Sequence, residues 1–139
     1  MDRLELVGAL DQASARASRD LDVLIQVNLD PESEQRQSRP ATGSRRSGVP
    51  AAGLAELVDQ LAAAQHLQVA GVMGVAPLAG DAHAAFARLR GASSQLRATW
   101  SEARVISAGM SGDWPEAVAE GATHLRLGSA VLGARAPLR

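Results

Sequence analysis

The stretch "VISAGMSGDWPEAVAEGATHLRLGSAVLGAR", Val105 to Arg135, contains five glycines and three serines. An apolar strand pattern, a Gly/Ser turn and a helix start follow one another twice in it, through Ser107–Asp113 and again through Arg126–Ala130. Glycine is costly inside regular structure, so such clusters mark places where the backbone approaches something closely, either a ligand or another part of the chain. Two successive strand–turn–helix units indicate an α/β fold.

Helical and strand patterns alternate upstream of this stretch as well. Strands are predicted at residues 21–28, 68–75, 103–107 and 123–127. Helices are predicted at 3–19, from Pro50 through at least Leu61, from Asp81 through at least Leu96, and at 113–121, with a last turn at 129–132. Asp81 is predicted to cap the third of these helices, and Asp113 and Glu116 have the spacing of a capping box.

This alternation, with short connections, predicts a parallel sheet with helices outside it. Two arrangements fit: a doubly wound open sheet, and part of a (β/α)₈ TIM-type barrel. A complete barrel takes about 250 residues and eight βα units. In the barrel case, the four predicted strands correspond to half of one.

The composition excludes several kinds of protein and site. A net charge of −1 favours neither nucleic-acid nor membrane binding, and no apolar run approaches the roughly 20 residues that span a bilayer. The absence of cysteine excludes disulfides and thiolate ligands. No lysine is present, so no side-chain amine can form a Schiff base. The three histidines are scattered, so neither a metal site nor a catalytic residue is predicted; a cytoplasmic protein fits these features.

The two glycine- and serine-rich junctions have two interpretations. Free backbone N–H groups at a helix start favour an anion, and the loops after the last two strands of a barrel commonly form a phosphate site. Ordinary turns between strands and helices are also rich in Gly and Ser. The environment of Arg126 also has two interpretations. Inside a barrel its charge would need a ligand or a carboxylate as partner, whereas at a frayed strand end it would be solvated by water.

The quoted stretch closely resembles the signature of the pyridoxal-phosphate homeostasis protein family, of the YggS/PROSC type. That signature reads approximately S-x-G-M-S-x-D, then A-x-x-x-G-[AS]-T-x-[VL]-R-[IL]-G-[ST]-A-[IVL]-[FL]-G. Upstream, "LIQVNL" and "AGVMGVAPL" are similar to the family's strand ends. The resemblance covers almost all of residues 1–139 except the segment 30–44.

The resemblance implies a (β/α)₈ barrel like the N-terminal domain of alanine racemase, with this chain as its C-terminal half. It implies a protein that binds pyridoxal 5′-phosphate without established turnover. Arg126 would approach the pyridine nitrogen of the cofactor. The cofactor phosphate would be held by Ser107, Gly109, Met110, Ser111, Gly128 and Ser129.

Two departures accompany the match. Family members carry the cofactor as a Schiff base on a lysine at the end of the first strand, and these 139 residues contain no lysine. The chain opens "MDRLELVGAL" where the family has S-V-D-x-x-x-L, so we expect a gene model that begins too late or a true truncation. Binding of the cofactor in this chain is therefore expected to be non-covalent and weak.

Three functions stay open at this point. The first is a non-catalytic cofactor-binding protein, and the second is a fragment of a racemase-like enzyme. The third is a non-binding remnant, or a module that works only after association with another half-barrel. An open half-barrel exposes sheet edges, which favours self-association.

Residues 30–48 are expected to form a flexible loop or insertion. Deleting Asp30–Ser44 should leave the free energy of unfolding nearly unchanged, because this segment has no large aliphatic or aromatic side chain to bury. Urea denaturation of the deletion variant beside the parent measures the effect. A loss of several kcal/mol would mean that the segment packs against the domain.

Overall fold

A computed structural model describes residues 1–31, 48–50 and 53–133 of the chain. Most of the segment 30–48, which the sequence assigns to a loop or insertion, lies outside these ranges. The helices are α1 (Glu5–Arg16), α3 (Leu54–Ala63), α4 (Ala82–Thr99), α5 (Trp114–Ala119) and α6 (Ser129–Leu132). The strands are β1 (Leu21–Gln26), β2 (Leu67–Met73) and β3 (Val105–Ser107).

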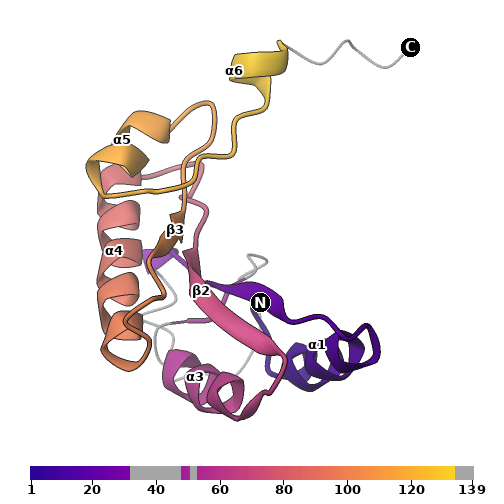
Figure 1. The fold of residues 1–139 in the computed structure, drawn as a ribbon. Coiled ribbons are helices and arrows are strands. Elements are labelled where there is room, and N and C mark those ends of the chain that lie inside the picture. The colour runs from indigo at the N-terminus through magenta and orange to yellow at the C-terminus, as the bar shows by residue number, and fades with distance from the viewer. Residues whose placement is uncertain (32–47, 51–52, 134–139) are drawn as a thin grey trace.

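The three strands form one parallel sheet in the order β1-β2-β3. The predicted class and the sequence order of these strands are confirmed. In Figure 1, α4 runs alongside the sheet, α1 and α3 lie towards its lower end, and α5 lies beside the upper end of α4. The short helix α6 stands apart at the top, at the end of an extended stretch.

The core lies between the sheet and the helices that cover it. Ile25 and Val72, from neighbouring strands, are fully buried, and α4 adds Phe86 and Leu89 at helical spacing. Burying a side chain of this size stabilises a fold by about 1.5–3 kcal/mol. The Asp81 carboxylate accepts a hydrogen bond from Ala84 N at 3.1 Å, which confirms the predicted cap of α4.

A buried carboxylate fixes α5 to α4. Glu120 follows α5, and its side chain is 6% exposed. One of its oxygens lies 3.2 Å from His83 Nδ1 and the other 3.2 Å from Arg90 Nε. Both partners come from α4, so the pair holds the last part of the chain against the helical layer.

The prediction of a regular strand at 123–127 is wrong. The segment runs parallel to β3, but its only bridge there pairs His124 with Ser107. Ile106 N donates to the Thr123 hydroxyl at 2.9 Å, so a side chain takes the place that a carbonyl would have in a ladder. Arg126 N donates to Gly109 O, which keeps the two segments side by side beyond the bridge.

The outer edge of β1 is covered by two single residues. Met1 donates its terminal amine to Leu24 O at 3.0 Å and accepts from Gln26 N at 2.7 Å. Val49 donates to Gln26 O and accepts from Asn28 N, which makes a parallel bridge to the end of this strand. Within the described ranges, no helix combines the length and apolar character needed to cross a membrane.

Gly71 allows β3 to approach β2. Its φ is +154°, and a Cβ placed on it would lie 1.9 Å from Val105 O. The pairing with β1 is also irregular here, because Leu24 pairs with Gly71 whereas Val23 pairs with Val69. Only glycine therefore suits this position.

Gly71→Ala is expected to destabilise the protein by more than about 2 kcal/mol, because backbone strain and a clash with Val105 act together. Gly91→Ala, inside α4, is the matched control, since nothing lies within 4 Å of its added Cβ. It should gain about 0.5–1 kcal/mol. Chemical denaturation of both variants measures the difference, and equal stabilities would contradict the account of Gly71.

Candidate site at the carboxyl ends of the strands

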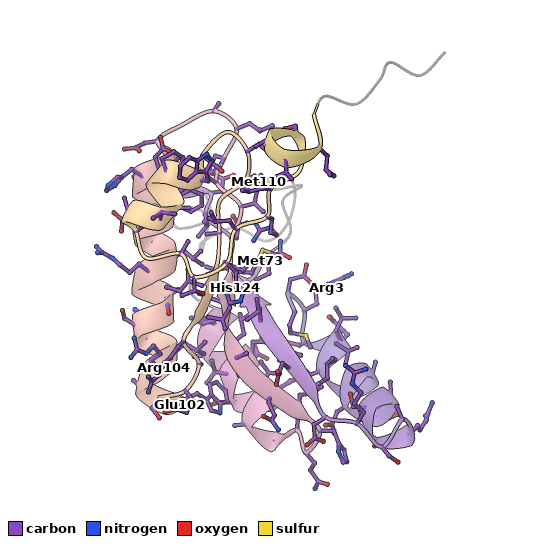
Figure 2. All side chains as sticks on the ribbon, turned by 45° about the horizontal axis from the view of Figure 1, so that its top comes forward. Arg3, Met73, Glu102, Arg104, Met110 and His124 are labelled. Atoms are coloured by element: carbon purple, nitrogen blue, oxygen red, sulfur yellow. The ribbon has the colours of Figure 1, made fainter. Side chains whose placement is uncertain are left out.

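The predicted site residues lie at or directly after the carboxyl ends of β3 and of the strand-like segment 123–127. Ser107 is the last residue of β3 and is buried, and Gly109, Met110 and Ser111 come directly after it. Gly128 and Ser129 begin α6. Figure 2 shows Met110 beyond one end of β3, with Arg104 and Glu102 at the opposite end. The structure thus gathers these residues at one end of the sheet.

Arg126 is half-buried and connects the ends of two strands. Its guanidinium donates to Ser107 Oγ at 2.7 Å and to Gly74 O at 3.0 Å. Both acceptors are neutral, and no carboxylate in the described ranges forms an ion pair with this arginine. Arg126 is therefore neither a solvated strand end nor a neutralised buried charge. It is an oriented cation at the carboxyl edge of the sheet.

The sequence did not identify Gly74 as part of this arrangement. A backbone carbonyl is present at every residue, so no pattern marks the one that receives a distant arginine. Gly74 also lies in close packing, because a Cβ there would come within 2.7 Å of Leu29 Cδ1. The only indication was its place at the end of a predicted strand.

Gly109 is explained by packing within the protein. Its φ is +84°, and an added Cβ would lie 2.8 Å from Ala117 Cβ and 3.0 Å from Leu125 Cδ2. The close approach predicted for the glycines is, at this position, an approach of the loop to α5 and to the following segment. Gly128 differs, since nothing lies within 4 Å of an added Cβ there.

Asp113 does not form the predicted capping box with Glu116. Its side chain makes no cap hydrogen bond to α5. Instead, Oδ1 accepts from Met110 N at 2.6 Å, three residues earlier in the chain. The carboxylate is used to close the glycine-rich turn, because the turn directs the Met110 N–H back towards it. The Met110 amide is consequently satisfied inside the loop.

A hydrogen bond also ties the first turn of α6 to the glycine-rich turn after β3. Ser111 Oγ accepts from Ala130 N, in the first turn of α6, at 3.1 Å. Four backbone N–H groups around this contact donate to no atom of the described residues: those of Ser111, Gly112, Gly128 and Ser129. None of these four N–H groups donates to a carboxylate of the described residues, so all four can donate to a bound anion. In the parts of the chain that the structure describes, no group of acidic or histidine side chains could hold a metal ion.

Comparison with known proteins identifies the relationship. The sequence model of the family "Alanine racemase, N-terminal domain" matches residues 1–136. The chain belongs to this family.

Similar curated proteins include pyridoxal phosphate homeostasis proteins. The one from Pseudomonas aeruginosa is 36% identical over 138 residues, and the one from Mycobacterium tuberculosis 35% over 141 residues. Each match covers 97% of this chain, but 54% and 52% of the relative. The chain therefore spans about half the length of these relatives.

A solved structure in the family shows the same fold. PipY of Synechococcus elongatus, determined with pyridoxal phosphate bound, is 32% identical and superimposes with a TM-score of 0.79. The match covers 96% of this chain and 58% of PipY. Together with the parallel sheet, these relationships establish an α/β fold of the TIM type.

The two site glycines are expected to respond differently to substitution. Gly109→Ala should cost about 2–4 kcal/mol, because its positive φ and its contact with Ala117 both oppose a side chain. Gly128→Ala should change stability by less than about 0.5 kcal/mol, since its Cβ meets open space. Thermal or urea unfolding of the two variants tests this. Similar losses at both positions would contradict the distinction.

Proposed function

We propose that this chain provides the phosphate-binding half of a pyridoxal 5′-phosphate site. In this proposal residues 1–139 form the C-terminal half of a (β/α)₈ barrel, with about four βα units. The unreversed order β1-β2-β3 supports the barrel over a doubly wound sheet. The names of the curated relatives and the PipY complex support the choice of ligand.

The observation that carries the proposal is the Ser111 Oγ–Ala130 N hydrogen bond. It joins two strand–helix junctions that together carry four backbone N–H groups without a partner among the described residues. The phosphate of the cofactor is an anion with several acceptor oxygens, and such donors bind it without requiring a cationic side chain. Ser129 adds a hydroxyl donor at the start of α6, and the open space at Gly128 leaves room for the phosphate.

Arg126 is the residue we assign to the pyridine ring. Ser107 and Gly74 hold its guanidinium in place, and its charge has no carboxylate partner in the described ranges. A cation fixed in this way favours an unprotonated ring nitrogen. Ser107 thus acts through Arg126, and its hydroxyl hydrogen is left to donate to the ligand while its oxygen accepts from the arginine.

Binding in this chain is proposed to be non-covalent and non-catalytic. Pyridoxal phosphate supplies an aldehyde that condenses with amines, but no side chain of the 139 residues carries a primary amine. Neither tyrosine nor cysteine is present to act as an acid or a nucleophile. The relatives' names state homeostasis and no reaction. A binding role therefore fits these residues better than racemase-like catalysis does.

Pyridoxal phosphate is expected to bind reversibly, and inorganic phosphate is expected to compete with it for the same donors. Isothermal titration calorimetry with and without phosphate measures both effects. After borohydride reduction, peptide mass spectrometry should find no cofactor on any side chain. The α-amino group of Met1 is analysed separately, since it is the one primary amine of the chain.

Gly128→Asp should reduce cofactor affinity at least about tenfold, because it places a negative charge where the phosphate would lie. Gly91→Asp introduces the same charge on α4 and should bind like the parent, which controls for net charge. If the folded parent binds neither pyridoxal phosphate nor phosphate, the chain is a non-binding remnant and the proposal fails.

A further inference from the structure

Helix α5 is held to the rest of the molecule by little apolar contact. Of its six residues only Ala117 is buried, whereas Trp114 and Val118 are 44% and 50% exposed. A single buried methyl group contributes much less to attachment than a buried leucine or phenylalanine does. Another interaction is therefore needed to keep α5 in place, and the carboxylate of Glu120, directly after the helix, provides it.

The Glu120 carboxylate is buried with a small number of charged partners. Within the described ranges these are two side chains of α4, Arg90 and His83, and His83 is charged only when protonated. Glu120 Oε2 lies 3.2 Å from Arg90 Nε and forms no hydrogen bond. Glu116, one turn earlier on the same face of α5, also has a buried Oε2 without a hydrogen bond. Arg90 is thus the one permanent cation, among the described residues, that compensates the charge of Glu120.

The attachment of α5 reaches the anion-binding turn through a packing contact. Ala117 lies against Gly109, since a Cβ added to Gly109 would come within 2.8 Å of Ala117 Cβ. The turn after Gly109 carries Ser111 and Gly112, whose N–H groups are two of the four assigned to the phosphate. A carboxylate that loses its cation regains water when α5 moves away from α4, because burying an unpaired charge is costly. Such a movement removes the support of the turn.

We propose that Arg90, an exposed residue of α4, is a positioning residue for the anion-binding turn. It acts through Glu120 and α5: its charge keeps the carboxylate buried, and the buried carboxylate keeps Ala117 against Gly109. The identity of the anion rests on the proposed function, whereas the effect of Arg90 on the order of the turn requires no ligand.

Arg90→Gln leaves the Glu120 carboxylate without its permanent cation. Amide hydrogen exchange at Met110 and Asp113, whose N–H groups are bonded within the turn, should become at least about tenfold faster, while exchange in β2 stays unchanged. Affinity for inorganic phosphate, measured by calorimetry, should fall at least about tenfold. Arg97→Gln is the matched control, because Arg97 is an exposed residue of the same helix without an ion pair in the described ranges. Both of its measurements should match those of the parent.

The double variant Arg90→Gln/Glu120→Gln also removes the unpaired carboxylate and should recover most of the exchange protection and of the phosphate affinity. A merely structural loss at Arg90 would not be recovered by a second substitution. His83→Gln removes the other partner of Glu120, should act in the same direction, and replaces Arg90→Gln if that variant does not fold.

Failure of the parent to bind phosphate would contradict the proposed function alone, because amide exchange in the turn then decides the role of Arg90. That role is overturned by unchanged exchange in the turn of Arg90→Gln, or by a uniform increase that includes β2. Unchanged phosphate affinity in Arg90→Gln beside a parent that binds, or no recovery in the double variant, overturns it as well.

Discussion

The close approach of β3 to β2 at Gly71 is the constraint on which the rest of the structure depends. Because no side chain separates Gly71 from Val105, the two strands pair in parallel up to Met73 and Ser107. Their carboxyl ends therefore finish side by side. This places the Gly74 carbonyl and the Ser107 hydroxyl where one guanidinium reaches both. The positions of the groups that hold Arg126 thus depend on a contact between Gly71 and Val105, several residues before the candidate site.

The position of α5 against α4 is a second requirement for the geometry of the candidate site. Glu120 holds α5 to α4 through His83 and Arg90, and α5 in turn packs against Gly109. The glycine-rich turn is therefore fixed from the outside of the sheet, while Asp113 closes it from within. A loop supported in this way holds its amides without a ligand, which lowers the entropy cost of binding one.

Periodicity in the sequence was sufficient to predict the class, the strand order and most helices. It failed where a side chain replaced a backbone group. The fourth strand looked regular from its alternation, but the Thr123 hydroxyl takes the N–H of Ile106. The Asp113–Glu116 spacing indicated a capping box, but the turn directs Met110 N to the same carboxylate. Gly109 looked like a ligand glycine, and only the position of Ala117 shows why it is needed. Such outcomes depend on tertiary distances, which local patterns do not contain.

The hydrogen bonds that Met1 and Val49 make to β1 also affect how copies of the chain could polymerise. Growth of a filament by strand addition requires every incoming subunit to offer one free edge and to leave another free. Here Met1 and Val49 already bond the outer edge between Leu24 and Asn28, so an incoming strand finds fewer free backbone groups on this edge. Two residues outside the regular strands thereby hinder strand addition at the second half of β1.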